Sequence, residues 1–283
     1  VAHGGGGRVS APAPSMFSPA ASSRLRALGL RPGRPNLEVF AETLQALAAA
    51  DGRLVAVTSD SRGSGKLGPF GQALPGQIVE VGIAEQNLVG IAAGLALCGQ
   101  KPFAVSPACF LTARALEQIK NDVCYSNAPV VLVGISAGVS YGALGSTHHS
   151  LHDFAALRAI HNVRVIAPAD QAETRAAVRL AAAATTPVYL RFGKAPMVEV
   201  HPAGAEPALT TAAVLRDGRD VAFLATGETV VHALLAAEEL AAGGLSARVL
   251  SVPTIKPLDR AAVLAAGRDC GAVVTVEEHS VHG

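Results

Sequence analysis

The residue with the strongest chemical signal is Glu85, a carboxylate within the segment VEVGIAEQNLVGIAAGLAL (79–97). The helical pattern that begins beside Glu85 is otherwise apolar almost all round, and such a helix is normally buried. Burying a carboxylate costs several kcal/mol unless the group is protonated or has a partner, so we expect a use for it. A buried carboxylic acid here could share a proton with a ring nitrogen of a ligand. In the alternative, Glu85 faces water and only stabilises the helix N-terminus electrostatically.

Three histidines, His148, His149 and His152, follow a glycine-containing segment. His148 and His152 stand four residues apart, the spacing at which two imidazoles on one helix can bind a metal ion. Gly142 and Gly145 indicate a loop, however, and no carboxylate or cysteine stands at ligand spacing, so we predict no metal site. Two interpretations stay open: the histidines contact a substrate at the carboxyl ends of the strands, or they are solvated side chains of a surface loop.

The segment Gly63-Ser-Gly-Lys-Leu-Gly68 satisfies the GxGxxG pattern of dinucleotide-binding folds. That motif must open a helix, but Pro69, Gly71 and Pro75 follow it, which is typical of a loop. A P-loop is also disfavoured, because Leu67 stands where that motif needs Ser or Thr. We therefore predict that this segment binds neither NAD nor a nucleotide.

The elements that must position these residues alternate between strand-like and helical patterns. In the first part of the chain, strands are predicted at 53–59, 77–81, 102–106, 129–135, 163–168 and 187–192. Helices are predicted at 36–50, 84–98, 111–126, 151–160 and 170–184, with Asp170 capping the last. Beyond a proline-containing linker, strands are predicted at 220–227, 246–252 and 271–278, and helices at 229–242 and from Asp259. The fold class is therefore α/β, with two doubly wound, mostly parallel sheets.

Domain boundaries follow from this pattern. We expect a disordered tail over 1–34, a first domain over 35–198, a linker over 199–208 and a second domain over 209–283. The tail is rich in Gly, Ala, Pro, Ser and Arg and cannot bury enough apolar surface to offset its ordering entropy. The last predicted strand has no helix after it, so we expect an uncovered strand and a truncated second domain.

The composition limits the classes of function. The 283 residues hold 23 Lys and Arg against 22 Asp and Glu, for a formal net charge of +1, whereas a nucleic-acid binder needs a clustered positive surplus. No apolar run reaches the roughly 18–20 uncharged residues of a membrane helix. The four cysteines form no CxxC pair and lie in apolar contexts, which favours a reducing compartment, and we expect the cytoplasm.

The segment around Glu85 resembles the strand–helix motif of the pyrimidine-binding domain of thiamine-diphosphate enzymes, in the transketolase and deoxyxylulose-phosphate synthase branch. Other segments match that family in the same order: SPACFLTARALEQIKNDV, GSTHHSLHDFAALRAI, NVRVIAPADQAET, PVYLRFGK, IKPLD and VTVEEHSVHG. The chain thus resembles the C-terminal half of a transketolase, of the type made as a separate subunit. The resemblance implies a pyrimidine-binding fold followed by a Rossmann-like C-terminal domain.

The resemblance implies how the cofactor thiamine diphosphate is bound. Glu85 stands where the family's glutamate hydrogen-bonds N1′ of the aminopyrimidine, and Phe110 where an aromatic ring stacks on that pyrimidine. Asp60 matches an acid that lies close to the cofactor. The family's Gly-Asp-Gly motif for diphosphate and Mg²⁺ belongs to the other half and is not present in this sequence. The resemblance therefore implies a diphosphate-binding partner subunit, an active site between chains and a dimer of heterodimers.

The resemblance also implies how a sugar phosphate is bound for two-carbon ketol transfer from a ketose to an aldose. His148 matches the histidine that contacts the donor ketose near its carbonyl, and Arg191 matches a position that binds the substrate phosphate. Two residues depart from the family pattern. Leu144 replaces an acid that meets a donor hydroxyl, and Ser136 replaces a histidine that often touches substrate.

Two alternatives share parts of this pattern. The β subunit of a 2-oxo-acid dehydrogenase has the same domain order. A non-catalytic regulatory paralogue is the second alternative, because Leu144 and Ser136 replace polar groups of the substrate site.

Overall fold

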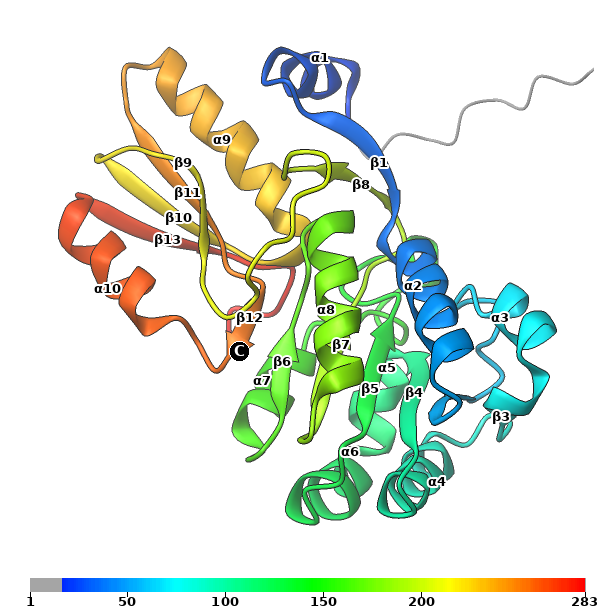
Figure 1. The fold of residues 1–283 in the computed structure, drawn as a ribbon. Coiled ribbons are helices and arrows are strands. Elements are labelled where there is room, and N and C mark those ends of the chain that lie inside the picture. Colours follow the sequence, from blue (N-terminus) through cyan, green and yellow to red (C-terminus); the bar gives the residue numbers. More distant parts are fainter. Residues whose placement is uncertain (1–16, 283) are drawn as a thin grey trace, which may run out of the picture.

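The larger of two main sheets has seven strands in the order β12-β6-β7-β5-β4-β2-β3, in a computed structural model that describes residues 17–282. Its strands are β2 (Leu54–Thr58), β3 (Ile78–Glu80), β4 (Lys101–Pro107), β5 (Val131–Ile135), β6 (Arg164–Ile166), β7 (Val188–Arg191) and β12 (Thr254–Lys256). All neighbouring pairs are parallel except β12 with β6, which is antiparallel. Strands β2, β4 and β5 are buried along nearly their whole length, as expected for a parallel sheet covered on both faces (Figure 1).

Two groups of helices cover the faces of this sheet. Helices α2 (Asn36–Ala50), α3 (Gly68–Ala73) and α8 (Gln171–Ala183) pack on one face, with Phe40 and Phe70 in the core. Helices α4 (Glu85–Leu97), α5 (Ala108–Arg114) and α7 (Asp153–Ala159) pack on the other. The alternation of strand residues between the two cores follows from the period of two along a strand.

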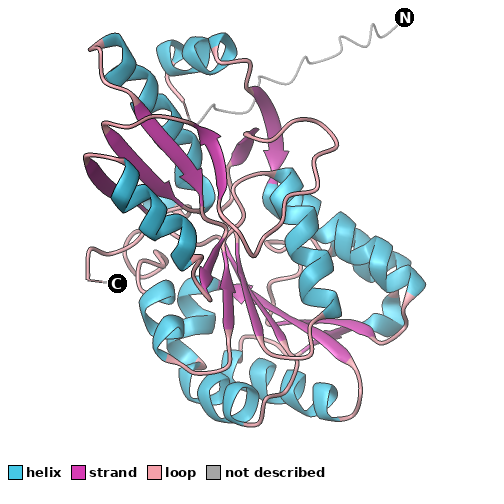
Figure 2. Ribbon diagram, turned by 60° about the vertical axis from the view of Figure 1, so that its left-hand side comes forward, coloured by secondary structure: helices cyan, strands magenta, loops and turns pink. Residues whose placement is uncertain are grey.

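The smaller main sheet has the strand order β13-β10-β11-β9 and lies beside the first (Figure 2). Its strands are β9 (Ala213–Arg216), β10 (Val221–Ala225), β11 (Ala247–Ser251) and β13 (Ala272–Val276), and only β9 is antiparallel to its neighbour. Helices α9 (Val230–Ala242) and α10 (Arg260–Asp269) cover its two faces. The predicted α/β fold with two mostly parallel sheets is confirmed. Val273 and Val274 on the edge strand β13 are each 42% exposed.

The predicted disordered tail is wrong for its second part, while residues 1–16 lie outside the described residues. Helix α1 (Pro19–Ala27) is capped by Ser18, and β1 (Arg31–Pro35) pairs antiparallel with β8 (Pro196–Glu199). Tertiary packing explains this order, since Leu25 of α1 is buried in a cluster with Val198 and Val231. Apolar surface elsewhere in the chain thus compensates for the weak local pattern.

Three other segments differ from the sequence expectation. The predicted helix over 111–126 is divided into α5, a short α6 (Leu116–Gln118) and a π-helical stretch over Ile119–Tyr125. The loop predicted after Gly68 contains the six-residue helix α3, which Pro69 can begin because a proline is tolerated in the first turn. Strand β12, from the predicted second domain, joins the sheet of the first, so main-chain hydrogen bonds connect the two parts.

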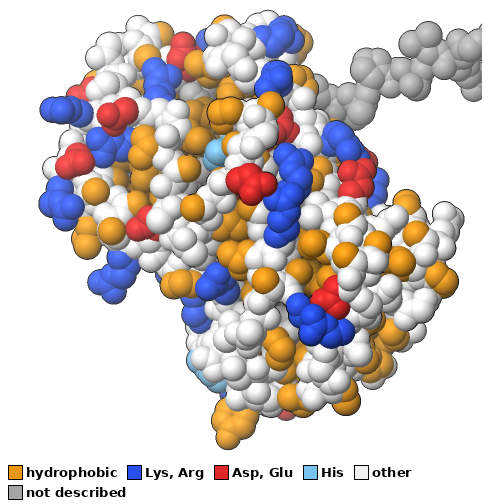
Figure 3. All heavy atoms as spheres, viewed as in Figure 1, with side chains coloured by type: hydrophobic (Ala, Val, Ile, Leu, Met, Phe, Trp, Pro, Cys, Tyr) orange, Lys and Arg blue, Asp and Glu red, His pale blue; other side chains and the backbone are white. Residues whose placement is uncertain are grey.

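The surface adds two observations on the described part of the chain. On the face seen in Figure 3, Lys and Arg side chains alternate with Asp and Glu, without a broad patch of one sign. Within residues 17–282, none of the helices combines the length and the apolar character needed to cross a bilayer.

Candidate functional site

The parallel strands bring the predicted site residues to one edge of the larger sheet. Asp60, Glu85 and Phe110 follow the carboxyl ends of β2, β3 and β4, and Ser136 follows that of β5. Arg191 is the last residue of β7. The crevice beyond the carboxyl ends of parallel strands is where open α/β sheets bind their ligands.

Glu85 is the first residue of α4 and is only 4% exposed, so the predicted burial of this carboxylate is confirmed. Arg114 is its partner: Nη1 donates to Oε1 at 3.0 Å and to Oε2 at 3.1 Å. The Arg114 side chain is itself 50% exposed. Together with Ile83, Ala84 and Gln86 these residues line an open pocket at the start of α4. The buried carboxylate therefore lies at the bottom of an open pocket, with Arg114 bound to it.

A row of aromatic and cationic side chains leads away from this pocket. The Arg114 guanidinium lies 4.1 Å from the ring centroid of Phe110. The Phe110 ring meets His148 edge-on at 5.2 Å, and His148 meets Tyr141 edge-on at 5.2 Å. Lys194 ends the row, with Nζ 4.5 Å from the Tyr141 centroid. The structure thus brings the predicted residues Phe110 and His148 into direct contact.

These residues fit an aminopyrimidine. The buried Glu85 carboxyl can exchange a hydrogen bond with a ring nitrogen, and Phe110 offers a flat apolar face. In this structure the Arg114 guanidinium contacts both the Glu85 carboxyl group and the face of the Phe110 ring. Because the Arg114 side chain is half-exposed, it can move into solvent without disturbing the hydrophobic core. For a metal ion, residues 17–282 contain no group of three or more His, Cys, Asp and Glu that could hold one.

The three histidines of the loop have different partners. His148 Nδ1 is 3.0 Å from Thr147 Oγ1, and His149 Nε2 is 3.2 Å from the Gly142 carbonyl. His152 Nε2 is 3.2 Å from Thr112 Oγ1 of α5. Of the three, His148 alone contacts the row of aromatic rings.

Asp60 lies at the end of β2 in a left-handed conformation, with φ of 54°. Its N–H donates to Glu80 Oε1 at 2.6 Å, and Thr58 Oγ1 donates to the other oxygen of Glu80 at 2.8 Å. Burial opposes ionisation, but these hydrogen bonds prevail and lower the pKa of Glu80. The exposed Asp60 side chain is thereby held on a fixed backbone at the strand edge.

Ser136 is buried beside this row, also in a left-handed conformation with φ of 54°. Its hydroxyl hydrogen-bonds the phenol of Tyr141, and this contact opposes the rise in the pKa of Tyr141 that burial causes. Ser136 is thereby linked to the row through Tyr141.

Arg191 departs from the predicted contact with a substrate phosphate. Its side chain is 4% exposed, and Nε donates to Asp153 Oδ2 at 2.8 Å. Nη2 donates to the carbonyls of Ser150 at 3.3 Å and Glu278 at 2.9 Å. The guanidinium also stacks on Phe154 at 4.5 Å. With these partners in place, the guanidinium is enclosed inside the protein and offers no open face to an anion.

Sequence reasoning missed Arg114, Tyr141 and Lys194. Arg114 stands four residues after Phe110 on the same helix, a spacing that puts both on one face and could have revealed the pair. Tyr141 and Lys194 meet only because the loop after β5 folds against the segment after β7. No local pattern in the sequence records that contact.

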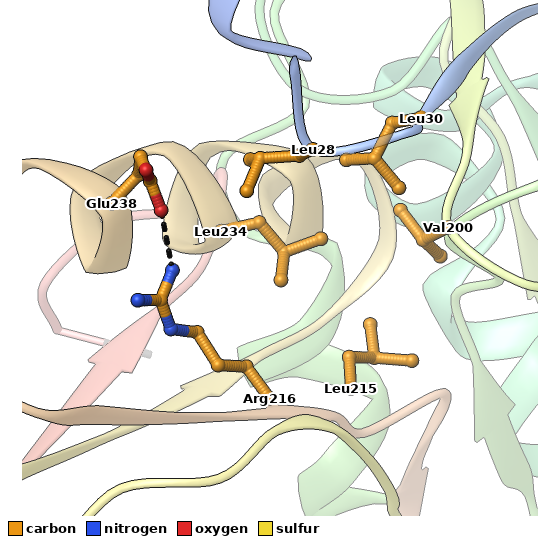
Figure 4. Close-up of a pocket in the computed structure, with 7 residues that line it drawn as sticks. All are labelled: Leu28, Leu30, Val200, Leu215, Arg216, Leu234 and Glu238. Atoms are coloured by element: carbon orange, nitrogen blue, oxygen red, sulfur yellow. Dashed lines mark hydrogen bonds and ion pairs between the residues drawn. The ribbon is translucent and has the colours of Figure 1, made fainter. Parts of the chain in front are cut away.

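A second pocket lies away from these residues, between the N-terminal segment, α9 and β9. Figure 4 shows the Arg216–Glu238 ion pair, 2.8 Å long, on one side of it. The remaining side chains that line it are apolar: Leu28, Leu30, Val200, Leu215 and Leu234. None of the predicted site residues lines this pocket.

Comparison with known proteins gives consistent matches. Residues 35–197 match the family model for the transketolase pyrimidine binding domain, and residues 210–283 match that for the transketolase C-terminal domain. The chain is 48% identical over 245 residues to one of the subunits of apulose-4-phosphate transketolase from Phocaeicola vulgatus, covering 86% of this chain and 78% of that protein. It is 40% identical over 246 residues to the 6-deoxy-6-sulfo-D-fructose transketolase subunit SqwH of a Clostridium species, covering 87% and 76%. A solved split-gene transketolase, described as an inactive β4 tetramer, has a TM-score of 0.81 and 38% identity, covering 89% of this chain and 81% of that one.

Proposed function

The chain belongs to the transketolase family, and on that basis we propose that it supplies the pyrimidine-binding half of a thiamine-diphosphate site for two-carbon ketol transfer. Family membership confirms the resemblance seen in the sequence. The relatives are transketolase subunits and deoxyxylulose-phosphate synthases, which favours ketol transfer over the 2-oxo-acid dehydrogenase alternative.

The observation that carries the proposal is the buried Glu85 carboxyl beside the ring of Phe110. Thiamine diphosphate supplies the carbon nucleophile and the electron sink when it is bound. Glu85 shares a proton with the N1′ nitrogen of the pyrimidine, and Phe110 stacks on that ring and fixes its plane. His148 orients the donor ketose beside the ring. Asp60, at the end of the neighbouring strand, lines the cofactor side of the site.

We further propose that a partner subunit holds the diphosphate and Mg²⁺. The family's Gly-Asp-Gly motif for these groups is not present in this sequence. Two of the relatives are themselves described as subunits, and the solved tetramer made of β chains alone is described as inactive. The proposed assembly is a dimer of heterodimers with the active site between unlike chains.

The substrates we propose are sugars with an anionic end. Two relatives are named for a ketose phosphate and for a sulfonated ketose, and both sugars carry a terminal anion. Arg191 is enclosed, but Lys194 is exposed at the end of the row that contains His148. Lys194 therefore supplies the contact to the substrate anion that the sequence had assigned to Arg191. Ser136, which hydrogen-bonds Tyr141 of the same row, contacts the substrate beside it.

The test is reconstitution. The full chain is combined with a diphosphate-domain subunit of a split transketolase, thiamine diphosphate and Mg²⁺, and ketol transfer is measured with phosphorylated and sulfonated ketoses. The proposal expects transfer by the pair and none by either subunit alone. A stable, cofactor-loaded pair that transfers no ketol unit would instead support the regulatory alternative, for which the exposed Leu144 in the His148 loop is the motivation.

A further inference from the structure

The loop that carries His148 is closed at its base by two hydrogen bonds. Gly138 N–H donates to the Ser150 carbonyl at 3.1 Å, and Ser150 N–H donates to the Gly138 carbonyl at 2.8 Å. Tyr141 and His148 lie on the loop between these two residues. Their position relative to Phe110 depends on how this base is held, because the loop is otherwise formed of short turns.

Glu278 holds that base from outside the larger sheet. It follows β13 of the smaller sheet, and its Oε1 accepts a hydrogen bond from Val139 N–H at 3.0 Å. The main-chain carbonyl of Glu278 accepts a hydrogen bond from Nη2 of Arg191 at 2.9 Å, and the same nitrogen donates to the Ser150 carbonyl at 3.3 Å. One residue of the second domain thus contacts one end of the loop directly and the other end through Arg191.

The backbone at Gly138 is adapted to this contact. Gly138 has φ of 62°, and a Cβ built there would collide with Oε2 of Glu278. A side chain at position 138 would therefore both strain the backbone and displace the Glu278 carboxylate. The residue after Glu278 is also fixed, since the His279 ring stacks on Phe154 at 5.2 Å.

Charged groups of both sheets surround the Glu278 side chain. The buried Arg191 guanidinium has one close anion, Asp153, and its Nη1 is 3.8 Å from Glu278 Oε2. Glu228 approaches from the smaller sheet, and burial, with a contribution from Glu278, raises the pKa of Glu228 to about 7. The Glu278 side chain therefore lies between a buried cation and a second buried acid.

We propose that Glu278 is a positioning residue, through which the C-terminal domain holds the His148 loop in the geometry that receives the donor sugar. The proposal rests on the proposed function of the site. It gives the second domain a part in substrate binding although none of its residues lies in the row from Arg114 to Lys194.

The first test is kinetic and uses the reconstituted pair. Glu278→Ala is expected to lower kcat/KM for the donor ketose about tenfold or more, while the Kd of thiamine diphosphate changes less than about twofold. Glu278→Gln is expected to recover most of the loss, because its amide oxygen still accepts from Val139 N–H. The matched control is Glu277→Ala, which removes the exposed neighbouring acid. Equal kcat/KM in the Glu278→Ala and Glu277→Ala variants, or an equal loss of cofactor affinity, would overturn the proposal.

The second test needs no activity and separates this proposal from the proposed function. Amide hydrogen exchange of the full chain is expected to be at least about tenfold faster at Val139 and across 141–148 in Glu278→Ala, and also in Gly138→Ala, than in wild type or Glu277→Ala. Unchanged protection in both variants would sink the positioning role even if ketol transfer is observed. Faster exchange in a pair that lacks ketol transfer would keep the positioning role and reject the function.

Discussion

In our proposal, the chemistry depends on Glu85, which is buried and lines a pocket with its carboxyl group. Glu85→Gln keeps the shape and the carbonyl acceptor but cannot share a proton. We expect kcat for ketol transfer to fall by about 100-fold or more, because a positioned general acid–base group contributes at least that much. Steady-state assays of the reconstituted pair give the measurement. Glu117→Gln, on the exposed surface of α6, is the control and should keep wild-type turnover.

Lys194 tests the proposed recognition of the substrate anion. Lys194→Ala should lower the preference for a phosphorylated ketose over the same ketose without phosphate by about tenfold or more, since a charge-assisted hydrogen bond is lost. Lys194→Arg should recover much of that preference. The ratio of the two kcat/KM values is the readout. Lys101→Ala, at the amino end of β4, is the control, and an unchanged ratio in Lys194→Ala would exclude the lysine from this role.

Among the helices and strands, α7 is tied to β7 by a buried network. Asp153 begins α7 with no exposed surface and accepts hydrogen bonds from Tyr189 Oη and Arg191 Nε, both at 2.8 Å. Asp153→Ala leaves the arginine charge buried without its closest partner, and we expect a loss of about 3–5 kcal/mol in the free energy of unfolding. Urea unfolding measures it. Glu206→Ala removes an exposed partner of Arg179 and should change stability little, so equal midpoints for the two variants would contradict this expectation.

The elements were predictable where local patterns and tertiary packing agree. Local patterns correctly located α4 and the cap of α8, where Asp170 Oδ1 accepts Glu173 N–H at 3.0 Å. Strands β1, β8, β9 and β12 were missed, because each exists through pairing with a segment distant in the sequence. Pairing of this kind leaves no periodic signal in a few residues.

In the candidate site, too, the features set by local patterns were predictable and those set by distant contacts were not. The burial of Glu85 followed from the apolar helix around it, and the residues at strand ends followed from the parallel sheet. The enclosure of Arg191 could not be predicted, because its partners Asp153 and Glu278 come from a different helix and a different sheet. Resemblance to a family position therefore does not give the contacts that Arg191 makes in this chain.

For the molecule as a whole, the junction between the two sheets contains groups that titrate near neutral pH. Glu173 of α8 accepts Ser251 Oγ of β11 at 2.7 Å, and burial raises its pKa from 4.5 to about 7. His201 Nδ1 is 3.0 Å from Asp170 Oδ2, and this hydrogen bond raises the pKa of His201 above its ordinary 6.5. Both groups bind protons more strongly in the folded state than in the unfolded chain.

The sign of the pH dependence follows from that difference. The contribution of Glu173 to stability is complete below pH 4.5 and is lost as the pH rises to about 7, and that of His201 is lost as the pH rises through its raised pKa. We expect the free energy of unfolding to fall by on the order of 3 kcal/mol for Glu173 over this range. Glu173→Gln should flatten the dependence and be more stable than wild type at pH 8. Urea unfolding at pH 5, 6.5 and 8 tests this, and a Glu173→Gln variant less stable than wild type at pH 8 would contradict it.

This chain, in our proposal, carries only the pyrimidine half of a site that a partner completes. The sharpest check is calorimetric titration of thiamine diphosphate with Mg²⁺ into the full chain alone, and then into the chain combined with a diphosphate-domain subunit. We predict saturable binding by the pair and none by the chain alone, with binding by the pair weakened in Glu85→Ala. Tight binding by the chain alone, or no binding by a stable pair, would contradict the proposal.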